Sequence, residues 1–97
     1  MKYEIVLAPE AIRDVRSLRA HVRSMVQDGI ETFLRQAPTK VSKSRIKRLR
    51  GLARPQFRLR LGEVRVYYDV REATVEVLAI VPKSEAVEWL KREGRSA

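Results

Sequence analysis

The stretch FRLRLGEVRVYYDV, residues 57–70, decides the fold, because it has the pattern of two strands joined by a tight turn. Large apolar residues alternate with arginines on both sides of Gly62-Glu63, which is the twofold periodicity of half-buried strands. A glycine followed by a second turn residue suits a two-residue type II′ turn, which prefers glycine in the first position. The pattern therefore predicts a β-hairpin.

The two-residue turn fixes the register of this hairpin, since residues equidistant from the turn must pair. Leu61 is then opposite Val64, and Arg60 is opposite Arg65. Because side chains alternate between the two faces of a strand, one face is apolar and must be directed to the core. That face carries Phe57, Leu59, Leu61, Val64, Val66 and Tyr68. The other face carries Arg58, Arg60, Arg65 and Tyr67.

The pair of Arg60 with Arg65 is unfavourable, since like charges directly opposite on a sheet cost up to roughly 1 kcal/mol. Guanidinium groups bind phosphate in a planar, bidentate way, and a tyrosine beside them, here Tyr67, can stack on a base. The arrangement predicts a phosphate-bearing partner at this face. The alternative is that the arginines are solvated or pair with Asp69 and Glu76 on the same sheet.

Further basic charge is concentrated just before the hairpin. The chain of 97 residues has a net charge of +9, and ten lysines and arginines but no acid lie between Glu31 and Glu63. A basic block within a folded domain predicts nucleic acid, an acidic protein segment or anionic lipid as the partner. A well-solvated loop is the alternative.

Other features of the composition exclude several classes of protein. The chain has no cysteine, so it cannot form disulfides, a thiolate metal site or a thiol nucleophile. We find no metal-binding constellation and no glycine-rich phosphate loop, and we expect no cofactor. No apolar run has the length of a membrane span, and residues 1–4 do not open a signal peptide. We therefore expect a cytoplasmic protein without a membrane partner.

Apolar periodicity predicts the elements before the hairpin. Residues 2–7 form a short strand, and the following apolar residues recur at helical spacing, which predicts two helices packed as a hairpin with a break within residues 18–21. Pro9 suits the first turn of the first helix, and Pro38 ends the second. Residues 39–54 are predicted to be a connection with room for one helical turn, which leads to Pro55 at the start of the first hairpin strand.

The C-terminal third is predicted to contain one strand and one helix. Residues 75–81 are almost entirely apolar and indicate a central strand covered on both faces. A short helix follows, with Ser84 as its N-cap, Gly94 at its end and Trp89 as a packing residue. We therefore expect one α+β domain over residues 1–97, with the order βααβββα. Its helical hairpin packs on a small, mainly antiparallel twisted sheet, and its C-terminal helix is short.

The run RLRGLARPQFRLRLGEVRVYYDV, residues 48–70, resembles the central signature of the RelE/ParE toxin superfamily, the toxin halves of type II toxin–antitoxin pairs. The resemblance covers nearly the whole chain. It includes the length, the element order, the Leu49-Arg50-Gly51 segment, the strand with alternating basic residues and the turn and strand of the form G-[DE]-x-R-V-x-Y. RelE-like members cut messenger RNA on the ribosome, whereas ParE-like members poison DNA gyrase and lack the nuclease residues.

The resemblance also implies site residues. The RelE active site uses two basic residues on the first hairpin strand, which match Arg58 and Arg60, and a third on the next strand, which matches Arg65. The sequence departs from the pattern near its C-terminus. Ser84 stands where the family has an active arginine, with Lys83 alongside, and the catalytic tyrosine has no clear counterpart.

The chemistry of RNA cleavage assigns different roles to the arginines and the lysine of such a site. Cleavage by an adjacent 2′-hydroxyl needs a base, cations for the developing charge and an acid for the leaving oxygen. Arginine stays protonated, so Arg58, Arg60 and Arg65 suit charge stabilisation, whereas Lys83 is the candidate for proton transfer, since neighbouring cations lower a lysine pKa. The expected docking contacts to RNA are basic, together with the one tyrosine: Lys43, Arg45, Lys47, Arg48, Arg50 and Tyr67.

Three functions stay open at the level of the sequence. The favoured one is a ribosome-dependent endoribonuclease toxin that cleaves messenger RNA and inhibits translation, with the ribosome, the message and a cognate antitoxin as partners. The second is a ParE-like toxin that inhibits DNA gyrase without cutting RNA. The third is a basic nucleic-acid-binding domain without toxicity, which has no antitoxin. Only the first two predict an acidic, amphipathic antitoxin segment that wraps the cationic surface.

Overall fold

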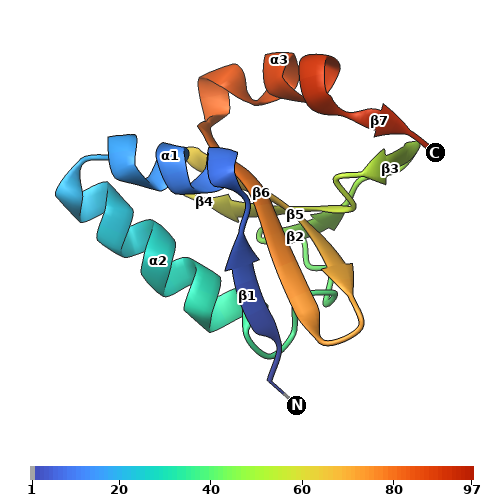
Figure 1. The fold of residues 1–97 in the computed structure, drawn as a ribbon, viewed down its shortest axis with the longest axis horizontal. Coiled ribbons are helices and arrows are strands. Elements are labelled where there is room, and N and C mark those ends of the chain that lie inside the picture. The colour runs from blue at the N-terminus through green and yellow to red at the C-terminus, as the bar shows by residue number, and fades with distance from the viewer. Residues whose placement is uncertain (1) are drawn as a thin grey trace.

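A computed structural model describes residues 2–97 as a central sheet with helices on both sides (Figure 1). The helices are α1 (Pro9–Ser17), α2 (Ala20–Leu34) and α3 (Lys83–Glu93). The strands are β1 (Glu4–Leu7), β2 (Ile46–Arg48), β3 (Leu52–Arg54), β4 (Phe57–Leu61), β5 (Val64–Arg71), β6 (Thr74–Pro82) and β7 (Arg95–Ser96). The predicted α+β class and the helical hairpin are confirmed, with the break at Leu18 and Arg19.

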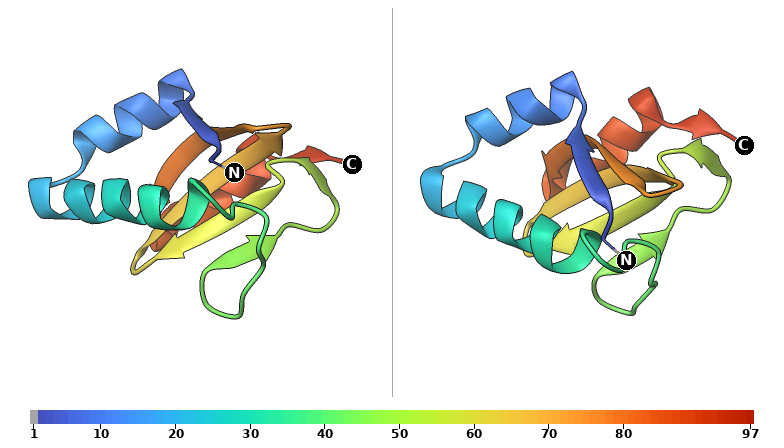
Figure 2. Two further views of the ribbon diagram at one scale, coloured as in Figure 1. Left: turned by 90° about the horizontal axis from the view of Figure 1, so that it is seen from below. Right: turned by 60° about the horizontal axis from the view of Figure 1, so that its bottom comes forward.

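Five strands form the main sheet in the order β1-β6-β5-β4-β2, and β3 and β7 form a separate two-stranded ribbon. Only β1 runs parallel to its neighbour β6, so the sheet is mainly antiparallel, as predicted. The helices α1 and α2 cover one face of the sheet, and α3 lies against the other (Figure 2). Below, the side that α3 contacts is called the outer face. No helix among the described residues combines the length and the apolar character needed to cross a membrane.

The hairpin of β4 and β5 has the predicted register at every pair, including Leu61 with Val64 and Arg60 with Arg65. Gly62 has φ of +58°, a conformation that glycine adopts without strain and that the first position of a type II′ turn requires. The apolar side chains of both strands lie in the core beneath α1 and α2. The alternation of the sequence therefore determines which arginines face away from the core.

Close packing of α2 on β4 depends on Gly29. A Cβ atom at this position would lie 2.6 Å from both terminal methyl groups of Leu61. The glycine lowers the helix propensity of α2, but it also allows the helix to approach the sheet more closely than any other residue would. Helix propensity gives no reason for a glycine within α2, and its packing role becomes visible only when α2 and β4 are placed together.

The strand β6 is covered on both faces, as predicted, but it changes face midway. The pairing with β5 shifts so that Tyr67 pairs with Ala79 and Tyr68 pairs with Val77, which leaves Leu78 as an extra residue. Val75, Val77 and Ile80 therefore face the core, whereas Leu78, Ala79 and Val81 face α3. A β-bulge reverses the alternation of a strand, and an uninterrupted apolar run gives no sign of where it occurs.

Three local predictions are wrong. Residues 39–54 contain no helical turn, and instead β2 pairs with β4, and β3 pairs with β7. Ile46 is the only buried residue of β2, and one apolar residue in three is too short a pattern to identify a strand. Ser84 is not the N-cap, because Pro82 takes that position and α3 begins at Lys83. Pro55 is buried ahead of the strand, since β4 begins at Phe57.

Candidate functional site

Arg58, Arg60 and Arg65 lie together on the outer face of β4 and β5, and we call these three residues the arginine face. The register places Arg60 directly opposite Arg65 and Arg58 directly opposite Tyr67. Arg60 is exposed, Arg58 is half-buried and Arg65 is only 7% exposed. Within residues 2–97 no carboxylate lies within ion-pair distance of any of the three. The hairpin therefore holds three cations close together without neutralising them.

The hairpin turn itself anchors Arg65. The Nη1 atom of Arg65 donates to the carbonyl oxygens of Gly62 at 2.7 Å and of Val64 at 3.1 Å. Both acceptors belong to the backbone, so the guanidinium is oriented without losing its net charge to a carboxylate. An arginine held in this way is prepared to meet an anion, because little side-chain freedom remains to be lost on binding.

Arg58 is held in an electrostatically unfavourable position. Its Nε atom is buried and has no hydrogen-bond partner among the described residues. Burial lowers the pKa of Arg58, and the charge of Arg65 lowers it further. Since arginine nevertheless stays protonated in proteins, the free protein retains a poorly solvated cation with an unused donor. Such a group gains most from an anionic ligand.

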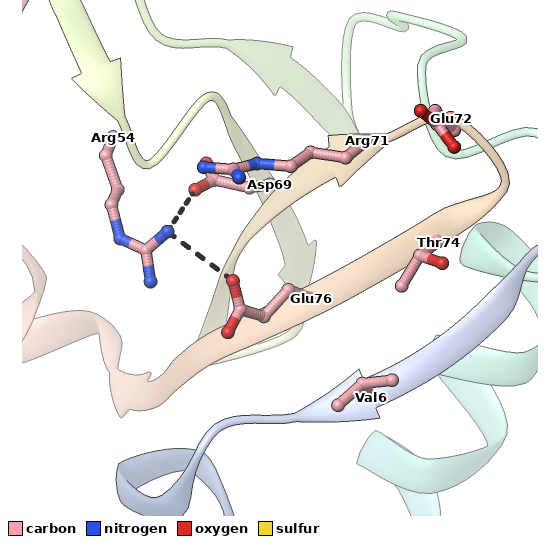
Figure 3. Close-up of a pocket in the computed structure, with 7 residues that line it drawn as sticks. All are labelled: Val6, Arg54, Asp69, Arg71, Glu72, Thr74 and Glu76. Carbon is pink, nitrogen blue, oxygen red and sulfur yellow. Dashed lines mark hydrogen bonds and ion pairs between the residues drawn. The ribbon is translucent and has the colours of Figure 1, made fainter.

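The acids of the outer face pair with a different arginine, Arg54, which ends β3 (Figure 3). Its Nη1 atom lies 3.0 Å from Oδ2 of Asp69 and 3.4 Å from Oε1 of Glu76. Asp69 is 3% exposed, and its Oδ1 atom also accepts the backbone N–H of Gln56 at 2.7 Å. The alternative that Asp69 and Glu76 neutralise the arginine face is therefore wrong. No sequence pattern indicates Arg54 as the partner of these acids, because residues 39–54 are predicted to be a connection.

An open cavity adjoins this paired cluster rather than the arginine face. It has a volume of about 670 Å³, and Arg54, Asp69 and Glu76 are among its lining residues together with Arg71 and Thr74. Asp69 and Glu76 have a basic partner in Arg54, and Glu72 and Arg71 add one charge of each sign to the lining, so the cavity offers a ligand less unbalanced charge than the arginine face does. Among the described residues, no group of His, Asp and Glu side chains is arranged to hold a metal ion.

Tyr67 does not present its ring for stacking on a base. The ring stacks on that of Trp89 of α3, with centroids 4.8 Å apart and planes inclined by 4°, and the residue is 1% exposed. The Nε1 atom of Trp89 donates to Oε2 of Glu10 in α1 at 2.7 Å, which ties α3 to the helical hairpin. Trp89 is a packing residue, as predicted, whereas the predicted stacking role of Tyr67 does not fit this conformation.

Lys83 lies at the start of α3, next to the turn of the hairpin. Its backbone N–H donates to the carbonyl oxygen of Glu63 at 2.7 Å, and its side chain is exposed. This contact brings the first residue of α3 to the end of the hairpin that carries Arg60 and Arg65. Ser84 follows it and is exposed as well.

The predicted docking residues do not share one surface. Lys47 of β2 pairs with Arg58 and so extends the arginine face across the sheet. The guanidinium groups of Arg45 and Arg48 lie over the rings of Phe33 and Phe57, at 5.1 and 5.0 Å from the ring centroids. The remaining two, Lys43 and Arg50, are exposed in the segments on either side of β2.

A sequence profile of a known protein family matches the part of the chain that contains the arginine face. The profile described as "ParE toxin of type II toxin-antitoxin system, parDE" matches residues 5–87, which include the five-stranded sheet except for its first residue, Glu4, and the arginine face. The chain belongs to the RelE/ParE toxin superfamily. Among curated proteins, no sequence is significantly similar to it.

Solved structures of RelE proteins share the fold. The RelB–RelE antitoxin–toxin complex of Methanococcus jannaschii matches with a TM-score of 0.67 and 18% identity, covering 87% of this chain and 96% of that chain. The RelE–RelB complex of Pyrococcus horikoshii matches with a TM-score of 0.69 and 22% identity, covering 86% and 97%. A free E. coli RelE variant with two arginines replaced by alanine matches with a TM-score of 0.68 and 24% identity, covering 96% and 99%.

Proposed function

We propose that this RelE/ParE-family toxin is a ribosome-dependent endoribonuclease that cleaves messenger RNA and thereby inhibits translation. The observation that carries the proposal is the arginine face. Three guanidinium groups converge on one surface of the hairpin, and none has a carboxylate partner in the described chain. A protein that needed these residues only for stability would gain from neutralising them, as it does with Arg54.

The arginine face suits the electrostatic part of RNA cleavage. When the 2′-hydroxyl attacks the adjacent phosphorus, negative charge accumulates on the non-bridging oxygens, and preoriented cations stabilise it without reorganising. Removing one such donor typically slows an enzyme about 10²–10³-fold. Arg65, which the carbonyl oxygens of Gly62 and Val64 hold in place, and the poorly solvated guanidinium of Arg58 are the cations best placed for this role.

The ribosome would supply the alignment that a small, open site lacks. Binding energy that holds the message in an attack-ready geometry offsets the entropic part of the activation barrier. The effective molarity of a reacting group held in this way is very large. Exposed basic residues of β2 and of its flanking segments would contact ribosomal RNA: Lys40, Lys43, Lys47 and Arg50. Binding that depends on these phosphate contacts should weaken steeply as the salt concentration rises. Lys83, next to the hairpin turn, is the proposed proton-transfer residue.

A cognate antitoxin is the second proposed partner. Two of the structures with the same fold are complexes of RelE with RelB, and this chain carries a net charge of +9. An acidic, amphipathic segment would complement that charge and cover the arginine face. A short neighbouring gene that encodes such a segment would support the proposal, and the absence of one would favour a nucleic-acid-binding protein without toxicity.

A ParE-like inhibitor of DNA gyrase is the alternative function. The matching family profile is named for ParE, and the resemblance to RelE nucleases implies that their active arginine would fall near Ser84, where this chain has no arginine. In this alternative the arginine face would bind a protein or DNA surface rather than a scissile phosphate. The two functions differ in whether RNA is cut.

The test is to add the purified chain to ribosomes programmed with a defined message and to map breaks by primer extension. The same message without ribosomes is the control for nonspecific cleavage. We expect breaks only in the presence of ribosomes, and we expect Arg65→Ala to abolish them. An intact message under conditions in which the chain still arrests growth would reject the nuclease, and loss of DNA supercoiling by gyrase would then establish the alternative.

A further inference from the structure

We propose that the Tyr67 hydroxyl is the proton donor to the leaving oxygen of RNA cleavage at the arginine face. This inference rests on the proposed nuclease function and assigns a residue that the function itself does not require. The chemistry needs such a donor, because a 5′-oxygen that leaves as a free alkoxide is strongly basic. Arginine cannot provide it effectively, since a guanidinium holds its proton too tightly.

The register of the sheet places Tyr67 among the cations of the site. Tyr67 pairs directly with Arg58 across the strands β4 and β5, and it follows Arg65 by two residues on the same face of β5. Directly opposite side chains on a sheet lie about 5 Å apart at Cβ, and next neighbours along one face lie about 7 Å apart. A phosphate held by Arg58 and Arg65 would therefore lie within reach of the neutral O–H donor between them.

Packing immobilises the ring but leaves its hydroxyl without a partner. The ring stacks on Trp89 at 4.8 Å, and Trp89 in turn is fixed by its hydrogen bond to Glu10. No group among the described residues forms a hydrogen bond with the Tyr67 hydroxyl, and this oxygen is not among the buried atoms that lack a partner. The small exposed part of the side chain therefore includes the hydroxyl. Tyr68, the next residue, differs, because its hydroxyl donates to the carbonyl oxygen of Pro38 in the core.

The 2′-oxygen forms a bond to phosphorus and loses its proton to solvent or to a base such as Lys83, and the bond between phosphorus and the 5′-oxygen breaks. The 5′-oxygen takes the phenolic proton of Tyr67 and leaves as a hydroxyl, while the other fragment ends in a cyclic phosphate. The tyrosinate that forms is stabilised by Arg58 and Arg65, and water returns its proton after the product leaves.

The surroundings of Tyr67 favour this direction of proton transfer. Burial raises the pKa of Tyr67, and the charges of Arg58 and Arg65 lower it by less, so the phenol is protonated at neutral pH. Its other close neighbours, Ala79 of β6 and Trp89 of α3, do not titrate. Asp69, the next acid along this face of β5, is engaged by Arg54.

The decisive experiment compares Tyr67→Phe with the wild type on ribosomes carrying two messages. One message has a normal phosphate at the cleavage position, and the other has sulfur in place of the bridging 5′-oxygen, because a thiolate leaves without needing a proton. Phenylalanine retains the stack on Trp89. Tyr3→Phe is the matched control, since Tyr3 directly precedes β1 and packs against the core beneath α1 and α2, away from the arginine face.

On the normal message we expect Tyr67→Phe to cleave about 10²–10⁴-fold more slowly than the wild type, the range typical of a lost general acid. On the sulfur-bridged message we expect nearly equal rates, with ribosome binding unchanged in a sedimentation assay. Normal cleavage by Tyr67→Phe, or a defect that the sulfur substitution does not rescue, would overturn the inference. If the wild type cuts neither message on ribosomes, the proposed function fails as well.

Discussion

The two ends of the outer face of β5 differ in whether their charged side chains are paired with a group of opposite charge. At one end, Asp69 is buried, and its two carboxylate oxygens accept hydrogen bonds from Arg54 and from the backbone N–H of Gln56. At the other end, Arg65 faces Arg60 across the hairpin and has only backbone carbonyls as partners. The two ends share a strand, a face and similar burial of their central residue, but only the negative charge of Asp69 is compensated by a group of opposite charge.

The difference separates charges that stabilise the fold from charges that are available to a ligand. Around Asp69, a lost partner would leave a buried group unsatisfied, so this cluster contributes to folding. Around Arg65, the free protein already has repulsion and an unsatisfied donor, which an anion would relieve. Stability and activity should therefore respond to mutations at opposite ends of the same face.

The largest effect on stability is expected for Asp69→Ala. This variant leaves the N–H of Gln56 without its acceptor and Arg54 with only the more distant Glu76, and we expect the free energy of unfolding to fall by about 2–4 kcal/mol. Urea denaturation followed by circular dichroism measures the change. Glu76→Ala is the matched control, because Glu76 is partly exposed and 3.4 Å from Arg54, and it should lose less than about 1 kcal/mol. Equal losses in the two variants would show that burial of Asp69 is not the source of stability.

The largest effect on function is expected for Arg65→Ala. Growth arrest should be lost and ribosome-dependent cleavage should fall at least about 100-fold, which corresponds to roughly 2.7 kcal/mol of transition-state stabilisation. The control is Lys91→Ala, since Lys91 is exposed on α3 and pairs only with Glu88 at 3.7 Å. Because Arg65 is buried, the unfolding curve of the Arg65→Ala variant is measured in parallel, to show that the variant is folded. Equal toxicity of the two folded variants would remove the arginine face as the functional site.

A smaller effect is expected where the basic surface extends onto β2. Lys47 pairs with Arg58, and its replacement by alanine should remove one phosphate contact. The logarithm of the affinity for ribosomes should then depend on the logarithm of the salt concentration with a slope smaller in magnitude by about 0.7. Sedimentation at several salt concentrations measures the slope. An unchanged slope would mean that RNA does not reach β2.

The smallest effect is expected at a third place where like charges meet, the contact between α1 and α3. Burial raises the pKa of Asp14, a hydrogen bond from the N–H of Ile80 opposes this, and the charges of Glu10 and Glu85 add to it. Asp14 therefore binds a proton more tightly in the folded state than in the unfolded state. Its contribution to stability falls as the pH rises above 3.8, the ordinary pKa of an aspartate.

Asp14→Asn tests this sign, because the amide can still accept the N–H of Ile80. The variant should be slightly more stable than the wild type at neutral pH, and the difference should shrink as pH falls toward 4. Thermal unfolding at a series of pH values measures it. A difference that grows on acidification would show that the carboxylate stabilises α3 in its ionised form.

Periodicity made the hairpin predictable in detail. Alternation from Phe57 to Tyr68 and one turn glycine were sufficient to give the register, the core face and the arginine face, because each of these follows from local rules. The two helices and the central strand followed from spacing in the same way. The position of the candidate site therefore follows from about a dozen residues.

The features that failed depend on contacts between segments far apart in sequence. Arg54 reaches Asp69 only because β3 pairs with β7 at the end of the chain, and Tyr67 is buried only because Trp89 is brought over it. The bulge at Leu78 reverses a strand that is apolar throughout, so no pattern marks it. Partner choice and burial of this kind are set by tertiary packing, which composition and spacing do not specify.

The central claim is that the arginine face is kept unpaired for a ligand at a cost to stability, and Arg60→Glu tests it most directly. The variant replaces the repulsion of Arg60 and Arg65 with an attraction at an exposed position. The account predicts that, in one preparation, the free energy of unfolding rises by about 1 kcal/mol while ribosome-dependent cleavage is lost. A variant that is no more stable than the wild type and still cuts the message at its normal rate would contradict it.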